Sequence, residues 1–178
     1  SYRFFVGEGV EVLIRRALPE GKSVTDEQVK LAVEAMEEEY GRRWADNTRP
    51  YDGIPEMLTW LEQRKIPKAV ISNKPDLFTQ IMVRELLPNW RFEVIRGATP
   101  SVPKKPDPTV ALEIAQQIGV DPQQVILVGD SNIDILTAIA AGMYPVGVRW
   151  GFRPVEELLE SGARVILNSP DDICKLFE

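Results

Sequence analysis

The stretch VILVGDSNID, residues 125–134, decides the fold of this chain. Its four leading apolar residues predict a short strand that is buried on both faces. Ligands of open α/β sheets bind just beyond the carboxyl ends of the strands, so Asp130 is expected at the rim of a sheet. Asp134 follows one helical turn later, and two carboxylates at such a rim suit Mg²⁺. The alternative is a plain strand-to-helix turn in which Asp130 or Ser131 caps the helix.

The chain around this stretch alternates helices with strands from about residue 50 onward. Strands are predicted at 68–72, 92–95, 125–128, 144–148 and 165–167, and helices at about 54–64, 76–87, 109–118, 133–141, 155–160 and 171–177. This alternation predicts an α/β fold built on a doubly wound, parallel, Rossmann-like sheet.

Residues 1–49 follow a different pattern, which predicts helices and no strand. Apolar residues from Phe5 and Val6 to Ala17 recur at helical spacing, and Thr25 begins a second amphipathic helix with a capping box. Two such helices bury too little apolar area alone, so this hairpin needs a partner surface. The chain is therefore predicted to divide into a helical domain, residues 1–49, and an α/β core domain, residues 50–178.

Composition excludes several classes of function. The net charge of −6 argues against nucleic acid or an anionic membrane as the main partner, and no apolar run approaches the length of a membrane span. The single cysteine, Cys174, rules out an internal disulfide framework and suits a cytoplasmic protein. Because the chain has no histidine, any chemistry must use carboxylates, lysine, hydroxyls or a hard metal.

Two further segments are expected at the same rim as Asp130. Ser72 and Asn73 end the strand at 68–72, where they could donate hydrogen bonds to phosphate oxygens. Lys105 lies in a loop, residues 99–108, that four prolines stiffen, and a held ammonium there could neutralise a phosphate. Taken alone, the Ser72–Asn73 segment is better explained as a plain strand-to-helix turn, and the lysines are at least as well explained as solvated residues of a turn.

The ordered set of segments closely resembles the haloacid dehalogenase superfamily of phosphohydrolases. The spacing and the run at 138–143 are most similar to its phosphoglycolate phosphatase branch. The resemblance implies that Ser72 binds the transferring phosphoryl group, with Asn73 assisting. It implies that Lys105 is the catalytic lysine rather than Lys104, because the family pattern is a lysine immediately before proline.

The same resemblance implies a magnesium site and a cap. Asp130 would bind Mg²⁺, and Asp134 would be a second ligand, directly or through water. Residues 1–49 resemble part of the helical cap that these enzymes insert between their first and second motifs.

One departure from the family is serious. Its first motif is a strand ending in two aspartates one residue apart, the nucleophile and the general acid/base, and nothing in this chain fits it. The pair Asp171 and Asp172 is adjacent and follows Pro170 rather than a strand. In the family fold the first strand is central, between the strands that end at Ser72 and Gly129. We therefore expect an upstream segment to supply this strand, and the 178-residue chain alone to be inactive.

The sequence thus predicts an Mg²⁺-dependent phosphatase that hydrolyses a small phosphate monoester, such as 2-phosphoglycolate, through an aspartyl-phosphate intermediate. Its partner would be a small phosphorylated metabolite rather than nucleic acid or membrane, and the protein a monomer or homodimer. Two alternatives stay open: a non-catalytic relative that binds phosphate or a protein, and a haloacid dehalogenase that needs no metal. The acidic pair Asp130 and Asp134 argues against the dehalogenase.

Overall fold

The computed structural model describes residues 10–17 and 25–177, and the chain forms two compact units, residues 1–49 and 50–178. The predicted helical positions Phe5 and Val6 lie outside the described residues. No helix in the described ranges is long and apolar enough to cross a membrane.

The first unit contains two helices, α1 (Val10–Ala17) and α2 (Asp26–Arg43). The predicted capping box at Thr25 is confirmed: the Gln28 amide donates to Thr25 Oγ1 at 3.2 Å, and the Thr25 amide donates to Gln28 Oε1 at 3.0 Å. These bonds satisfy backbone donors that the first turn of a helix otherwise leaves unpaired. Arg15 of α1 donates to Asp26 at 2.8 Å, so an ion pair ties the two helices together.

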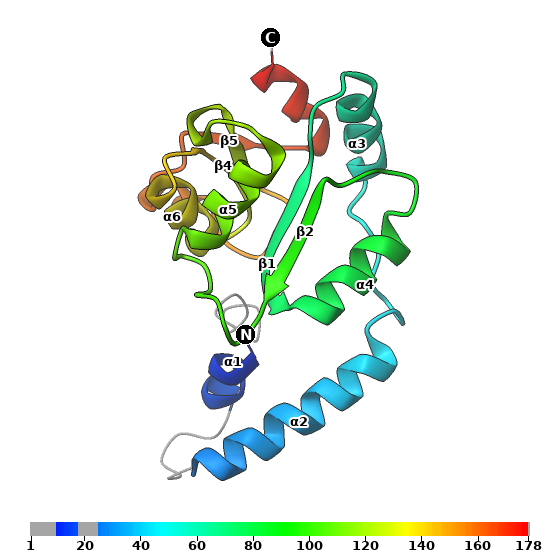
Figure 1. The fold of residues 1–178 in the computed structure, drawn as a ribbon, viewed down its shortest axis with the longest axis vertical. Coiled ribbons are helices and arrows are strands. Elements are labelled where there is room, and N and C mark those ends of the chain that lie inside the picture. The colour runs from blue at the N-terminus through cyan, green and yellow to red at the C-terminus, as the bar shows by residue number, and fades with distance from the viewer. Residues whose placement is uncertain (1–9, 18–24, 178) are drawn as a thin grey trace. The chain divides into compact units, whose positions relative to one another are not determined.

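The second unit alternates helices and strands, as the sequence predicts (Figure 1). Its elements in chain order are α3 (Ile54–Gln63), β1 (Ala69–Pro75), α4 (Asp76–Leu86), β2 (Val94–Ala98), α5 (Thr109–Ile118), η2 (Pro122–Gln124), β3 (Ile126–Gly129), α6 (Asn132–Ala140), β4 (Tyr144–Val148), α7 (Val155–Glu160), β5 (Val165–Leu167) and η3 (Pro170–Leu176). The closing helix is a 3₁₀-helix, and backbone bonds at its two ends run from Asp172 to Ser169 and from Phe177 to Cys174.

The strands are parallel, but they form two sheets rather than one. One sheet has the order β1-β2 and the other β3-β4-β5. Ala69 pairs with Val94 in the first sheet, and Gly129 pairs with Gly147 in the second. The predicted parallel α/β architecture is therefore confirmed. A continuous sheet is not formed, because no described strand lies between β1 and β3, each of which ends its sheet.

Helices cover both faces of the β1-β2 sheet, with α4 on one side and α5 on the other (Figure 1). This follows from right-handed crossovers, because the chain steps outward from β1 to β2 and then back toward β3. In the second sheet, α6 packs on β3 and β4, and α7 packs on β4.

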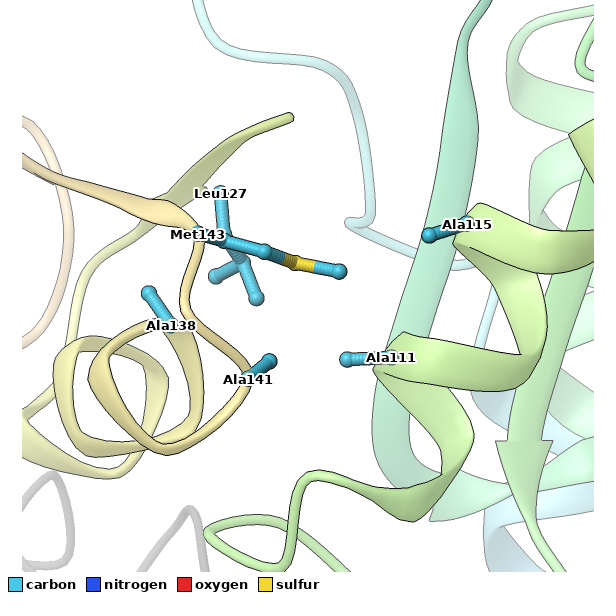
Figure 2. Packing of buried hydrophobic residues seen from close by; sticks show 6 residues of the cluster. All are labelled: Ala111, Ala115, Leu127, Ala138, Ala141 and Met143. Atoms are coloured by element: carbon cyan, nitrogen blue, oxygen red, sulfur yellow. The ribbon is translucent and has the colours of Figure 1, made fainter. Parts of the chain in front are cut away.

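Two apolar clusters form the core of this unit. The first joins Ala111 and Ala115 of α5 to the β3–β4 region, where Met143 points toward Ala115 (Figure 2). The second cluster contains Leu61, Val146, Val148, Leu167 and Ile173. Together they fix β3 and β4, and hence the loop that begins at Asp130.

A groove of about 440 Å³ separates the two sheets, and we call it the inter-sheet groove. Its walls include Ala69, Val70 and Ile71 of β1, and Ile126, Leu127 and Val128 of β3. Val128 is 41% exposed although it belongs to a strand of the α/β unit. Burial of apolar surface stabilises a fold, so covering the apolar walls of this groove would add to the stability of the described chain.

Candidate active site

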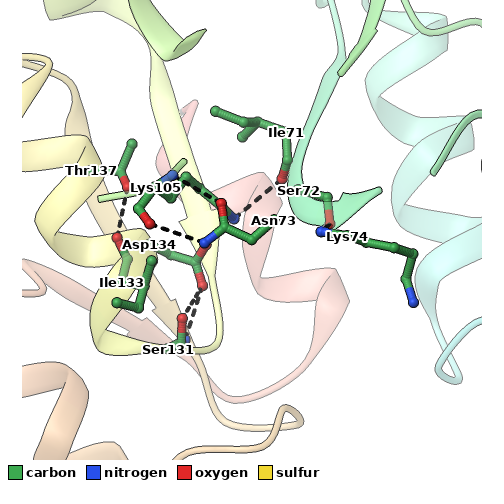
Figure 3. A network of polar contacts seen from close by, with 9 residues as sticks. All are labelled: Ile71, Ser72, Asn73, Lys74, Lys105, Ser131, Ile133, Asp134 and Thr137. Carbon is green, nitrogen blue, oxygen red and sulfur yellow. Dashed lines mark hydrogen bonds and ion pairs between the residues drawn. The ribbon is translucent and has the colours of Figure 1, made fainter. Parts of the chain in front are cut away.

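Three predicted segments meet at the carboxyl ends of β1 and β3 (Figure 3). Ser72 and Asn73 lie in the last part of β1, where the pairing with β2 becomes irregular between Ile71 and Pro75. Lys105 comes from the loop between β2 and α5, and Asp134 from the first turn of α6. Parallel strands bring their carboxyl ends to one edge, which explains why segments far apart in sequence converge here.

Asn73 clamps the backbone of Lys105. Its Nδ2 donates to the Lys105 carbonyl at 3.0 Å, and its Oδ1 accepts from the Lys105 amide at 2.9 Å. Asn73 is only 8% exposed, so these bonds are shielded from competition with water. Asn73 was predicted to assist phosphate binding, and these two bonds add a role in positioning Lys105.

The Lys105 ammonium is held at two points. Nζ lies 2.6 Å from Asp134 Oδ1 and donates to the Ile71 carbonyl at 3.3 Å. The Lys105 and Asp134 side chains are only 12% and 10% exposed. An ammonium has three donors, so these two contacts leave one for a ligand.

Asp134 uses both of its carboxylate oxygens within the chain. Oδ1 faces Lys105, while Oδ2 accepts from the Ser131 amide at 3.1 Å and from the Ser131 hydroxyl at 2.6 Å. Ser131 is the N-cap of α6, as one of the two sequence interpretations predicted. A direct bond from Asp134 to a metal would displace one of these contacts, so its predicted metal role is better served through water.

Asp130 keeps one oxygen for a ligand. Oδ2 accepts from the Phe152 amide at 2.9 Å, and no hydrogen bond within the described ranges reaches Oδ1. Across residues 10–17 and 25–177, no cluster of three acidic, histidine or cysteine side chains is present that could hold a metal by itself. Mg²⁺ is commonly held by one or two carboxylates together with water and substrate phosphate. Asp130 fits that pattern as a single protein ligand.

Ser72 and the neighbouring lysines complete the arrangement. Ser72 Oγ accepts from the Lys74 amide at 3.1 Å, which leaves its hydroxyl proton to be donated to an anion. The Lys74 side chain extends away from Lys105 (Figure 3), and Lys104 is exposed. Lys105 is therefore the lysine that the fold holds inside the site.

Asp107, in the same loop as Lys105, has a capping role. Its Oδ1 accepts from the Thr109 amide at 2.9 Å, at the start of α5. Hydrogen bonds from the Thr109 side chain and backbone lower the pKa of the Asp107 carboxyl below its ordinary value.

We expect Asn73→Ala to lower the free energy of unfolding by about 1–3 kcal/mol, because two part-buried backbone groups of Lys105 lose their partners. Urea denaturation measures this change. Asn89→Ala is the matched control, since Asn89 is exposed and the substitution should leave the midpoint in place. Equal midpoints for the two variants would contradict the clamp.

Two backbone contacts of the site are among those that were not predicted from the sequence. The Phe152 amide donates a hydrogen bond to Asp130, 22 positions away in the sequence. The Ile71 carbonyl accepts a hydrogen bond from Lys105 Nζ, 34 positions away. Both use backbone atoms, which every residue carries. The only sequence signal was Gly151, a glycine directly after β4 and its turn.

Comparison with known proteins gives the same assignment. The haloacid dehalogenase-like hydrolase family matches residues 2–148. The phosphoglycolate phosphatase of Pseudomonas fluorescens is 34% identical over 180 residues, covering 99% of this chain and 65% of the relative. That of Pseudomonas putida is 36% identical over 162 residues, covering 88% of this chain and 59% of the relative. The chain thus spans less than two thirds of these curated relatives.

Solved structures share the fold. A protein from Lactobacillus delbrueckii subsp. bulgaricus, named by prediction as a phosphoglycolate phosphatase, superposes with a TM-score of 0.90 at 31% identity. The match covers 98% of this chain and 81% of that protein. By its matching family and these relatives, the chain belongs to the haloacid dehalogenase-like hydrolases and is similar to their phosphoglycolate phosphatases.

Proposed function

We propose that the whole protein is an Mg²⁺-dependent phosphatase that hydrolyses a small phosphate monoester of the 2-phosphoglycolate type. The observation that carries the proposal is the convergence of Ser72, Lys105 and Asp134 at the carboxyl edge of β1 and β3, with Asp130 directly after β3. Hydroxyl and ammonium donors at the same strand edge as Asp130, a carboxylate with one unengaged oxygen, suit a phosphate bound together with a divalent cation. The curated relatives named as phosphoglycolate phosphatases support the substrate class.

In this proposal an aspartate from a segment outside the 178 residues is the nucleophile. Its carboxylate oxygen attacks phosphorus, the bond from phosphorus to the leaving alcohol breaks, and an upstream acid gives the alcohol a proton. Water then hydrolyses the aspartyl-phosphate, releasing phosphate and restoring the carboxylate. The 178-residue chain alone would therefore be inactive.

The inter-sheet groove supports the proposal that a segment outside the 178 residues adds a strand between β1 and β3. Residues of β1 and β3 both line it, and within the described residues each of these strands stands at the edge of its sheet. A strand inserted there would pair with both edges and bury Val128, which is 41% exposed. Such a strand, running parallel to its neighbours, would end at the edge where Lys105 and Asp130 lie.

The residues of this chain would bind and orient the phosphoryl group. Lys105 and Ser72 would donate to its oxygens, and Asn73 would hold the Lys105 backbone in place. Asp130 would hold Mg²⁺, which draws negative charge from the phosphoryl group during transfer. The helical unit of residues 1–49 is proposed as part of a cap that excludes water from the site.

The test is phosphate release by the protein that includes the upstream segment. We expect hydrolysis of 2-phosphoglycolate with Mg²⁺, no hydrolysis with a chelator, and no hydrolysis by the 178-residue chain. A hexose phosphate and a nucleoside monophosphate in parallel define the substrate class.

Other outcomes would overturn the proposal in favour of a named alternative. Halide release from a 2-haloacid in the presence of chelator would identify a dehalogenase. Phosphate binding without turnover of any ester would identify a non-catalytic relative.

A further inference from the structure

The loop between β4 and α7 rests directly on Asp130. The Phe152 amide donates to Asp130 Oδ2 at 2.9 Å, and the neighbouring residue is Gly151. A Cβ atom at position 151 would lie closer than 3.0 Å to the Cβ, Cγ and Oδ2 atoms of Asp130. The backbone of Gly151 is not in the left-handed region, so the need for glycine here comes from space and not from φ.

This loop is fixed by contacts that lie away from the site. The Arg149 amide donates to the Leu167 carbonyl of β5 at 3.0 Å, and Trp150 packs on the second apolar cluster. On the other side, Arg153 lies 3.7 Å from Glu157 of α7. The positions of Gly151 and the Phe152 amide are therefore set by β4, β5 and α7, independently of what binds at Asp130.

We propose that Gly151 and the Phe152 amide are positioning groups that select the side-chain conformation of Asp130 and leave its Oδ1 free to bind the cation. The inference rests on the proposed function. The absent side chain at 151 lets the Asp130 carboxylate pack against the backbone, and the amide engages only Oδ2. A side chain at 151 would push the carboxylate out of this position and break the amide bond.

A second glycine makes the arrangement distinctive. A Cβ at Gly129 would lie closer than 3.0 Å to the Cβ, Cγ and Oδ2 of Asp134. Each acidic side chain thus packs against a glycine, but Asp134 is directed to Lys105 and Ser131 while Asp130 keeps an oxygen unengaged. Both carboxylates therefore approach a glycine closely, but their hydrogen-bond partners differ.

The experiment compares Gly151→Ala with Gly147→Ala in the protein that includes the upstream segment. A Cβ at Gly147 would contact Ile166 and Leu158 in the core, so this control disturbs packing without touching Asp130. Calorimetric titration with MgCl₂ alone, without substrate, measures cation affinity. We expect Gly151→Ala to weaken Mg²⁺ binding by about 10–100-fold, the range found when partners that orient a metal ligand are lost. Gly147→Ala should keep the wild-type affinity, as should Phe152→Ala, which retains the backbone amide.

The outcomes separate this inference from the proposed function. If the wild type binds Mg²⁺ and Gly151→Ala binds it equally well, the positioning role is wrong and the proposed function stands. If Gly151→Ala and Gly147→Ala lose Mg²⁺ affinity equally, the loss comes from general destabilisation of the fold, and the inference is also overturned. If the wild type does not bind Mg²⁺, the proposed function and the inference both fail. A crystal structure of Gly151→Ala with an unmoved Asp130 carboxylate would be equally decisive against it.

Discussion

Lys105→Met is expected to reduce kcat/KM for phosphate-ester hydrolysis by about 10²–10³-fold, the usual effect of removing one donor that stabilises developing negative charge. Lys105 is the lysine that the fold directs into the site, with Nζ 2.6 Å from Asp134. Lys104→Met is the matched control, because Lys104 is adjacent and exposed and its loss should leave activity unchanged. Loss of activity in Lys104→Met with activity retained in Lys105→Met would reverse the assignment.

The same substitution has a stability cost that must be separated from catalysis. Removing Lys105 leaves the Asp134 carboxylate, about one-tenth exposed, without its cation. Breaking a buried ion pair from one side typically costs about 3–5 kcal/mol. The double variant Lys105→Met with Asp134→Asn removes both charges and keeps an acceptor for Ser131. We expect urea denaturation to show stability largely restored in the double variant, while kcat/KM stays as low as in Lys105→Met.

The positions of helices and strands were predictable because local signals agree with the final packing. The helix at 109–118 and the strands at 144–148 and 165–167 have the predicted bounds. Pro108 precedes that helix and Gly119 ends it in a left-handed conformation, so the sequence itself indicates where the helix begins and ends. The closing segment is a 3₁₀-helix, and Asp172 accepts from the Asn168 and Ser169 amides at its start.

The residues of the site were predictable, but their partners were not. The rule that ligands bind at the carboxyl ends of parallel strands is enough to bring Ser72, Lys105 and Asp130 to one edge. It does not say that Asn73 would hold Lys105, 32 positions away, or that Asp134 would pair with Lys105, 29 positions away. These choices depend on loop geometry and on which polar groups become buried together, and no periodicity in the sequence encodes them.

The described strands form two sheets, β1-β2 and β3-β4-β5, where the sequence predicted one. Each strand forms where its own apolar residues can pack against a helix, so β1 and β3 are present as predicted. Joining them requires a strand with free backbone groups on both sides. No described strand lies between β1 and β3, and apolar residues of both strands line the inter-sheet groove.

Asp130→Asn is expected to abolish Mg²⁺-dependent hydrolysis, lowering kcat by at least about 10³-fold. The metal contributes several kcal/mol of charge stabilisation, and each 1.4 kcal/mol corresponds to roughly tenfold in rate. Asparagine has the same shape, and its carbonyl oxygen can still accept from the Phe152 amide. The free energy of unfolding should therefore change little, while calorimetry should show weaker Mg²⁺ binding. Asp171→Asn, an exposed control, should leave both unchanged.

Asp134→Asn tests whether Asp134 positions Lys105 while Asp130 binds the cation. Because Asp134 is committed to Lys105 and Ser131, its neutralisation should lower stability and misplace Lys105, raising KM for the ester more than it weakens Mg²⁺ binding. Asp130→Asn should show the opposite pattern, with cation affinity lost and stability kept. If Asp134→Asn instead abolishes Mg²⁺ binding as fully as Asp130→Asn does, both carboxylates bind the cation directly. In that case the Asp134 contacts described here would have to rearrange when the cation enters.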